Sequence, residues 1–397
     1  MGFFDNITMS RGQPEPTIAR CGSCGLWKKC HTPKMKVAGR GKIPILFVGE
    51  APGETEDRQG APFLGDAGQC LREMLHDLDF ELDDAWVTNA AICRPPGNEI
   101  NDDIIDACRP NLVNTIKRLQ PRCVVLLGQS AVAGALTRLW GGAVGPMGRW
   151  AGWQIPNRDP PTWFCPTYHP SFVKRTNNDA ALVTVTKQHL RAAIDLGTTN
   201  WHKPKTHTKE ELGAKVEVIT SPAKRLAWLA EEEGDLGFDY ETDGLKPEAP
   251  GHRIVSVAFS LNGETTFACK IDPTLYPAIS KILLSSRLRK IASNLKFEER
   301  WSIRMLGHGV TGWLWDTMLA AHVQDNRKQI SSIKFQAFLR FGLGNYGASV
   351  EPYIGATTPN GFNRMADCPS LVYNGLDALI EYMVAKEQMR ELGVRNV

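Results

Sequence analysis

The stretch LFVGEAPGETEDRQGAPFLGDAG, residues 46–68, places a carboxylate, several glycines and a lone aromatic directly after an apolar run. Gly49 and Gly53 can adopt backbone angles that other residues avoid, so this loop can let a ligand approach the main chain. Glu50 stands where the apolar run ends, which is where α/β sheets place ligand chemistry. The stretch therefore indicates a binding or catalytic loop in which Glu50 takes part.

A second set of reactive side chains consists of cysteines. Cys21 and Cys24 form a CxxC motif, and Cys93 and Cys108 follow in two separate segments. Four thiolates can close a tetrahedral zinc site or a cubane iron–sulfur cluster, and the spacing does not choose between them. Ordinary buried thiols are the other interpretation. Cys30 lies close enough in sequence to Cys24 to compete as a ligand.

A third set consists of carboxylates in the second half of the chain. Asp239 and Glu241 lie two apart on a predicted strand, so their side chains point to the same face. Glu298 lies on a predicted helix, and Tyr373 and Asp377 lie four apart on one face of another helix. Such carboxylates could hold two Mg²⁺ or Mn²⁺ ions, one activating water and one stabilising a leaving 3′ oxygen, with the tyrosine orienting the water. A solvated acidic surface is the alternative.

Alternating strands and helices must position the first two sets. Apolar runs end in turn residues at 43–49, 85–90, 123–128 and 163–169, and helical patterns span 67–78 and 102–119. This alternation predicts a mostly parallel sheet covered by helices on both faces, with the loops gathered at one edge.

A different pattern begins near Val216. Residues 216–219, 236–245 and 252–271 predict a mixed sheet whose central strands form a meander, and helices dominate from about Trp301. The polar, cationic segment 198–215 is typical of a linker. A chain of 397 residues is too long for one ordinary core, so we expect domains at 1–197 and 216–397.

The first half resembles the family 4 uracil-DNA glycosylases over residues 20–195. Its loop at 46–68 is followed in order by TNAAICRPPGN (88–98), ACRPNL (107–112), VVLLGQSA (124–131) and PTYHPS (166–171). The resemblance implies the three-layer, parallel-sheet glycosylase fold and a [4Fe–4S] cluster with Cys21, Cys24, Cys93 and Cys108 as ligands. Zinc remains an alternative, and Cys30 departs from the family pattern.

The same resemblance implies four roles in a base-excision pocket. Phe63 would stack on a flipped base, and the Asn89 amide would read its pyrimidine edge by donating and accepting hydrogen bonds. Glu50 would stabilise the sugar cation or position the attacking water. His169 would donate a hydrogen bond to the base oxygen that gains charge.

The second half, residues 216–395, resembles the tyrosine-containing, DNA polymerase I-like 3′–5′ exonucleases of the DnaQ-like superfamily. WDTMLAAHV, residues 315–323, is similar to a segment of proofreading domains. The resemblance implies an RNase H-like mixed sheet and metal-binding roles for the carboxylates at 239, 241, 298 and 377, with Tyr373 positioning water. The family usually has Asp where this chain has Glu298.

The two resemblances together predict a bifunctional DNA enzyme of a kind found in bacteriophage replication proteins. Its partners would be uracil-containing DNA, 3′ ends of DNA and a polymerase on a separate chain. Alternatively, the first half is an inactive DNA-binding module for the exonuclease, or it acts on modified pyrimidines.

The overall composition agrees with a globular intracellular protein. A net charge of +3 neither requires nor excludes nucleic acid. The chain has no apolar run of the roughly 18 residues that a membrane span needs. The N-terminal residues lack a secretory signal. We therefore expect a cytoplasmic protein without a membrane partner.

Overall fold

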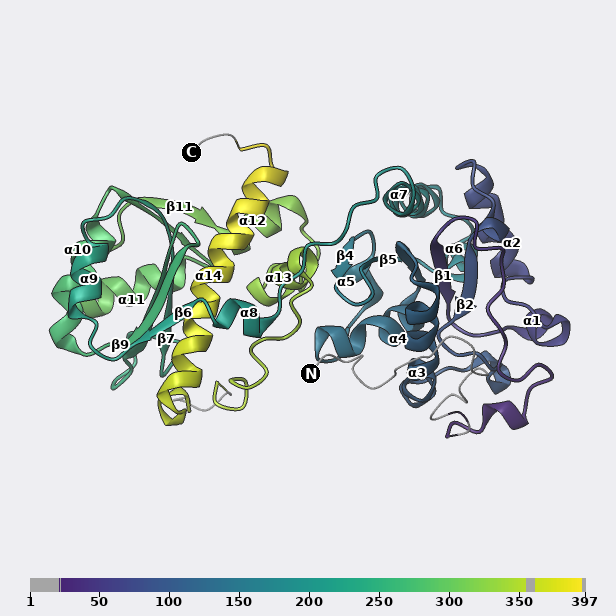
Figure 1. Cartoon of the computed structure of the whole chain (residues 1–397), viewed down its shortest axis with the longest axis horizontal. Coiled ribbons are helices and arrows are strands. Elements are labelled where there is room, and N and C mark those ends of the chain that lie inside the picture. Colours follow the sequence, from purple (N-terminus) through teal and green to yellow (C-terminus); the bar gives the residue numbers. More distant parts are fainter. Residues whose placement is uncertain (1–20, 22, 355–360, 395–397) are drawn as a thin grey trace. The chain divides into compact units, whose positions relative to one another are not determined.

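The computed structural model describes residues 21, 23–354 and 361–394, which fall into two compact units divided between Thr206 and His207. Each unit is a sheet packed against helices (Figure 1). The first twenty residues, including those that bear on a secretory signal, lie outside the described residues. Within the described part of the chain, no helix combines the length and apolar character that crossing a membrane requires.

The first unit contains a five-stranded sheet in the order β2-β1-β3-β5-β4. Its strands are β1 (Ile45–Gly49), β2 (Trp86–Asn89), β3 (Cys123–Leu127), β4 (Ile155–Asn157) and β5 (Thr162–Thr167). All neighbouring pairs are parallel except β4 and β5, which are antiparallel. The predicted mostly parallel sheet is therefore confirmed, with the short edge strand β4 added to it.

Helices cover both faces of this sheet. They are α1 (Glu54–Gln59), α2 (Asp66–His76), α3 (Asp102–Leu119), α4 (Gln129–Trp140), α5 (Met147–Trp150), α6 (Pro170–Arg175) and α7 (Ala180–Gly197), with 3-10 turns at Leu26–Lys28, Leu82–Asp84 and Pro96–Asn98. Phe47 and Val125 point to the face where α2 and α7 contribute Leu71 and Leu190 to one buried cluster. Alternate residues of β1 and β3 face α4, which packs on both strands and on α3. Both strands are therefore buried throughout, as their continuous apolar runs predict.

Parallel pairing brings the carboxyl ends of the strands to one edge. Gly49 at the end of β1 lies beside Asn89 at the end of β2, and Leu127 at the end of β3 lies beside Thr167 at the end of β5. The loops that follow these strands therefore start from the same side of the sheet.

The second unit contains a six-stranded sheet in the order β11-β10-β7-β8-β9-β6. Its strands are β6 (Val216–Ile219), β7 (Gly234–Thr242), β8 (Ile254–Leu261), β9 (Thr265–Lys270), β10 (Leu288–Ala292) and β11 (Trp313–Asp316). The strands β7, β8 and β9 form an antiparallel meander, and the remaining neighbours pair in parallel. This result confirms the predicted mixed sheet with a central meander.

The helices of the second unit lie in two layers. They are α8 (Lys209–Gly213), α9 (Ala223–Leu229), α10 (Tyr276–Leu284), α11 (Lys296–Leu306), α12 (Thr317–Gln324), α13 (Ile333–Phe341) and α14 (Asp367–Glu391), with 3-10 turns at Pro273–Leu275 and Phe362–Arg364. Leu226 of α9, Ile279 of α10 and Trp301 of α11 pack with Phe238 on one face of the sheet. The long helix α14 crosses the other face, where α8, α12 and α13 adjoin it (Figure 1).

The segment 198–215, predicted as a linker, is folded in its second half. Thr208 caps α8 through a reciprocal capping box with Glu211, which satisfies backbone N–H groups at the start of that helix. Leu212 of α8 is fully buried in a cluster that includes Leu376 of α14. Because an apolar side chain is buried there, residues 209–213 belong to the second unit rather than to a linker.

Candidate functional sites

Gly49 creates the space in which two of the predicted base-binding side chains meet. A Cβ atom at Gly49 would lie 2.5 Å from Asn89 Oδ1 and 2.6 Å from Phe63 Cζ. Any larger residue would therefore displace the amide, the ring or both. The structure thus brings Phe63 and Asn89 together at the carboxyl end of β1.

The loop that carries Phe63 is held by a buried carboxylate. Phe63 itself is only 5% exposed and has a left-handed backbone with φ of 59°, an uncommon conformation for a non-glycine residue. Glu56 accepts hydrogen bonds from the N–H groups of Gly53 (3.1 Å), Leu64 (3.0 Å) and Gly65 (2.7 Å). These bonds fix both ends of the loop. Sequence reasoning missed Glu56, although its place in the first turn of a helix after Gly53 is a capping-box signal.

Glu50 begins the loop after β1 and is held by a neighbour from another strand end. The Ser130 hydroxyl, in the first turn of α4, donates a 2.7 Å hydrogen bond to Glu50 Oε2. Ser130 lies in the segment 124–131 singled out from the sequence, but sequence reasoning assigned it no role. Glu50 is half-buried, and the bond from Ser130 orients its carboxylate.

His169 is the N-cap of α6 and is oriented by the helix that it starts. The Ser171 N–H lies 3.2 Å from His169 Nδ1 and donates to it, and the Ser171 hydroxyl lies 2.6 Å from the same atom. Burial lowers the pKa of His169, while the negative charge of Glu50 acts in the opposite direction and Arg175 lowers it further. Because Nδ1 is an acceptor, the neutral ring carries its proton on Nε2.

The four side chains predicted for the pocket therefore converge. The rings of Phe63 and His169 are 6.5 Å apart between centroids, Phe63 meets Asn89 over Gly49, and Glu50 is close enough to perturb His169. The site offers an aromatic face, an amide, a carboxylate and an imidazole N–H at one sheet edge. This donor and acceptor set suits a planar polar ring with charge developing on one of its oxygens.

The four predicted cysteine ligands also approach one another. Cys108 interacts electrostatically with Cys21 and Cys24, and Cys93 interacts with Cys108. Burial raises the pKa of Cys93 to about 12 and also raises the pKa of Cys108. The Lys34 N–H donates a 3.2 Å hydrogen bond to Cys93 Sγ, and the backbone at Ile92 bonds to Cys108.

By their chemistry, the four thiols suit a zinc ion or an iron–sulfur cluster. Among the described residues, no three cysteine sulfurs all lie as close as 4.8 Å to one another. The ligands of a cubane cluster bind four different irons and lie farther apart. N–H groups directed at sulfur stabilise the thiolate form that such ligands need. Cys30 lies next to Cys93, within hydrogen-bonding reach, outside the predicted set.

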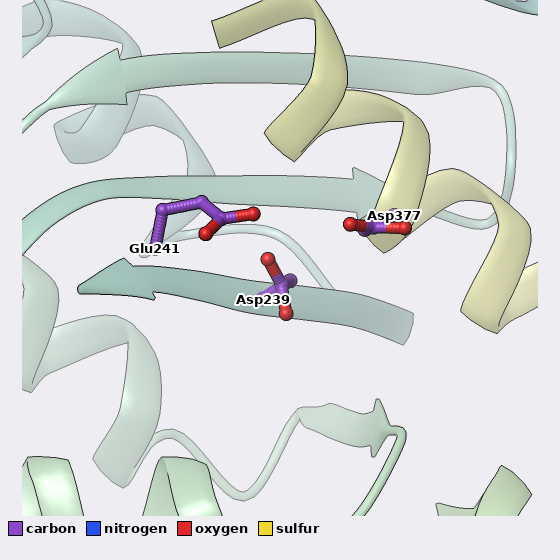
Figure 2. A group of neighbouring side chains, drawn as sticks. All are labelled: Asp239, Glu241 and Asp377. Atoms are coloured by element: carbon purple, nitrogen blue, oxygen red, sulfur yellow. The ribbon is translucent and has the colours of Figure 1, made fainter. Parts of the chain in front are cut away.

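In the second unit, three predicted carboxylates form a compact group. Asp239, Glu241 and Asp377 each offer one oxygen, and these oxygens all lie within 4.8 Å of one another (Figure 2). Asp239 and Glu241 project from β7 and Asp377 from α14. The Asn374 amide donates to Asp239 Oδ2 at 2.7 Å and so orients that carboxylate.

A glycine on β7 permits the approach of α14. A Cβ atom at Gly237 would lie 2.4 Å from the Ala378 carbonyl oxygen. Gly237, Asp239 and Glu241 alternate along the strand and therefore share the face that α14 covers. The bare backbone at Gly237 thus lets Asp377 come close to the two carboxylates of the strand.

Glu298 and Tyr373 flank this group. Glu298, in the first turn of α11, is 2% exposed, and its charge acts on both Asp239 and Glu241. It lies outside the three-carboxylate group itself. Tyr373 is hydrogen-bonded to Asp377. All five predicted residues of this site therefore lie near one another.

Burial and mutual repulsion make this group electrostatically unfavourable when it is fully ionised. The pKa of Asp239 is raised well above its ordinary value, first by burial and then by the surrounding carboxylates. The pKa of Glu241 is raised by burial and by Asp377, while the Lys334 ammonium opposes this shift. Divalent cations are the usual partners of such clusters, since hard cations prefer carboxylate oxygens.

Sequence reasoning missed two residues of this site. Glu381 lies one helical turn after Asp377 on α14 and is 2% exposed, and its spacing from Tyr373 and Asp377 was a usable signal. Tyr346 donates a hydrogen bond to Asp377 Oδ1 from the segment after α13, and no sequence pattern pointed to it.

Comparison with known proteins places the first unit in a family. Residues 37–194 match the family model described as the uracil DNA glycosylase superfamily. The type-4 uracil-DNA glycosylase of Pyrobaculum aerophilum is 38% identical over 170 residues, which cover 40% of this chain and 81% of that relative. The type-4 uracil-DNA glycosylase of Thermotoga maritima is 30% identical over 173 residues, covering 41% and 82%.

Solved structures give weaker similarities. A structure described as the apo form of the nuclease has a TM-score of 0.35 and 17% identity, covering 45% of this chain and 79% of that one. Brucella melitensis NrnC with bound Mg²⁺ has a TM-score of 0.32 and 14% identity, covering 45% and 81%. At these TM-scores, neither similarity assigns a family to any part of the chain. The family model does so for residues 37–194, and together with the sequence relatives it shows that the chain belongs to the uracil-DNA glycosylase superfamily, among the type-4 uracil-DNA glycosylases.

Proposed function

We propose that the first unit excises uracil from DNA by hydrolysing the N-glycosidic bond. Membership of the family and relatives whose names describe this activity support the proposal. The observation that carries it is the meeting of the Phe63 ring and the Asn89 amide over Gly49, with His169 beside the ring. A glycosylase needs such a pocket because it acts on a base extruded from the stack.

The geometry supports a division of labour in this pocket. Phe63 stacks on the flipped base, and Asn89 both donates to and accepts from its pyrimidine edge. As the bond to the sugar breaks, negative charge develops on the base, and the Nε2–H of His169 donates a hydrogen bond to its oxygen. Glu50, held by Ser130, stabilises the positive charge on the sugar or positions the attacking water.

The chemistry of the four cysteines supports a [4Fe–4S] cluster as the group they hold. When bound, the cluster crosslinks the segment of Cys21 and Cys24 to Cys93 and to Cys108 on α3. Asp57 holds the chain directly after Cys30, because it accepts hydrogen bonds from the His31 and Thr32 N–H groups.

For the second unit, we propose Mg²⁺- or Mn²⁺-dependent 3′–5′ exonuclease activity on DNA. The proposal is supported by the carboxylates of Asp239, Glu241 and Asp377 within 4.8 Å of one another, and by the nearby Glu298. These half-buried and buried carboxylates fit divalent cations, which when bound would stabilise the attacking and leaving oxygens. Tyr373 would position the attacking water. The sheet order, in which a meander is followed by two parallel strands, suits the RNase H-like fold predicted from the sequence.

One substrate tests both proposals. We would incubate the protein with a 3′-recessed duplex that carries uracil, in EDTA and in Mg²⁺, and measure abasic sites and 3′ trimming separately. We expect abasic sites in both buffers and trimming only with Mg²⁺. Glu50→Gln or His169→Ala should sharply reduce uracil release, and Asp239→Ala should abolish trimming.

The outcomes separate the alternatives. No abasic sites in either buffer would favour an inactive DNA-binding module, and release of modified pyrimidines alone would favour a changed substrate. Trimming that persists in Asp239→Ala would refute the exonuclease proposal. A polymerase on a separate chain, a bacteriophage origin and a cytoplasmic location remain predictions from the sequence.

A further inference from the structure

The face of α14 that meets the sheet carries a third polar residue beyond the predicted pair. Tyr373, Asp377 and Glu381 follow at intervals of four residues, so their side chains lie along one side of the helix. Glu381 is 2% exposed, and Ser293, directly after β10, donates its N–H to Glu381 Oε1 at 3.1 Å. Glu381 is therefore a deeply buried carboxylate with one oxygen oriented by the backbone.

A second buried carboxylate reaches the same region from α11. Glu298 is also 2% exposed, and its negative charge acts directly on Glu381. In the described part of the chain, Oε2 of Glu298 and Oε2 of Glu381 are both buried and have no hydrogen-bond partner. Leaving a buried carboxylate oxygen unpaired is costly, and two such oxygens on glutamates whose charges act on each other indicate a missing positive partner.

The surrounding charges do not supply that partner. The groups that act on Glu381 besides Glu298 are the carboxylates of Asp377 and Asp316. Glu381 in turn is the largest charged influence on Asp239. The nearby cation, Lys334, faces Glu241 and Asp377. Among the described residues, the charged groups that act on Glu381 are therefore carboxylates.

We propose that Glu298 and Glu381 together bind one of the two divalent cations of the second unit, beside the ion held by Asp239, Glu241 and Asp377. The inference rests on the proposed exonuclease function and adds Glu381 as a ligand. The inference also gives a reason for Glu298, where proteins of the proposed family usually have Asp. The second ligand of the proposed ion, Glu381, lies one helical turn after Asp377 on α14. The charges of both glutamates act on Asp239.

The competing explanation is that the two glutamates share a proton and serve only the core. A shared proton would satisfy the unpaired oxygens without a metal. The two explanations predict different effects on cation binding when one negative charge is removed. Loss of a ligand weakens the binding of one cation selectively, whereas loss of a buried acid without a ligand role acts through its charge on both cations alike.

The test counts bound Mn²⁺ in the full-length, cluster-containing protein by electron paramagnetic resonance and calorimetry. We expect two Mn²⁺ ions for the wild-type protein. In Glu381→Gln, the Kd of one of them should rise by about tenfold or more, while the other is retained. Glu298→Gln should have the same effect. Glu387→Gln, on the same helix but paired with Arg390, is the matched control and should bind both ions normally.

Each outcome bears on one of the two proposals. Two ions of unchanged or equally weakened affinity in Glu381→Gln and Glu298→Gln would overturn the inference while leaving the exonuclease intact. No Mn²⁺ binding in the wild-type protein would instead refute the exonuclease proposal. As a readout that does not use turnover, Mn²⁺ should raise the melting temperature less in Glu381→Gln than in Glu387→Gln. An equal rise in both would also count against Glu381 as a ligand.

Discussion

A methyl group at Gly237 would test how closely α14 must approach β7 for the carboxylates to form a metal site. The new Cβ atom would lie 2.4 Å from the Ala378 carbonyl oxygen and 3.2 Å from Tyr382 Cβ. Ordinary van der Waals contact begins near 3.4 Å. The strand and the helix must therefore separate by about 1 Å, because both contacts involve rigid parts of the chain rather than flexible side-chain ends.

A separation of the strand and the helix by this amount exceeds what metal–ligand geometry tolerates, whereas a packed core tolerates it at a moderate cost in stability. Metal–ligand distances have to be kept within about 0.2 Å, and a misplacement of about 1 Å costs on the order of 10²-fold in rate. Overpacking of a buried site lowers the free energy of unfolding by about 1–3 kcal/mol. We therefore expect Gly237→Ala to lose about 10²-fold in Mg²⁺-dependent trimming while remaining folded.

The assay compares initial rates of 3′ trimming with thermal unfolding. Gly213→Ala is the matched control, because its Cβ atom would lie 3.4 Å from Val372 Cγ1, an ordinary contact, on a helix that also adjoins α14. Its trimming rate should stay near that of the wild-type protein. Uracil release, which belongs to the other unit, should be unchanged in both variants.

A wild-type trimming rate in Gly237→Ala, together with unchanged Mn²⁺ affinity, would refute this reasoning. Such a result would mean that α14 can shift without disturbing the carboxylates, and that the close contact at Gly237 serves packing alone.

Three further predictions concern single residues. Gly49→Ala should reduce uracil release by about 10²-fold in single-turnover assays and leave trimming intact. The reason is that its Cβ atom would lie 2.5 Å from Asn89 Oδ1 and 2.6 Å from Phe63 Cζ. Uracil release equal to that of the wild-type protein would contradict the proposed pocket. Burial lowers the pKa of His169 from its usual 6.5, so the neutral donor persists in weak acid, and the rate of release should decline only below pH 6.5. A decline already centred above pH 6.5 would argue against a neutral His169 as the donor. Burial lowers the pKa of Lys290 to about 8 from 10.5, so between these values the unfolded chain binds more protons and the free energy of unfolding should rise with pH. Lys290→Met should weaken that rise in urea titrations, and an identical slope would show that Lys290 does not cause it.

Local patterns in the sequence predict most of the elements that carry the two sites. The predicted runs at 43–49, 85–90 and 123–128 contain β1, β2 and β3, and the two inner strands β1 and β3 are buried throughout because both of their faces are covered. The meander around β7 was predictable for a related reason, since strand patterns separated by turn residues pair with their neighbours. The three-residue edge strand β4 was not predictable, because it is too short to show an alternation of apolar and polar residues.

The candidate residues were also visible in the sequence, but their supports were not. Glu50, Phe63, Asn89 and His169 have distinctive side chains at the ends of predicted strands. Ser130, Tyr346 and Glu381 act through hydrogen bonds between segments 31 to 88 residues apart in sequence. Glu56 and Glu381 had local signals that sequence reasoning did not use, whereas no local pattern points to Ser130 or Tyr346.

The sequence by itself therefore determined which side chains were available and which strands and helices would carry them, since periodicity and turn chemistry act over a few residues. The tertiary structure decided which of them meet. Two glycines illustrate this. Position 49 needs a glycine because Asn89 and Phe63 approach it closely, and position 237 needs one because Ala378 does. Close approach between distant segments is a property of packing, and packing exists only once the sheets and helices have come together.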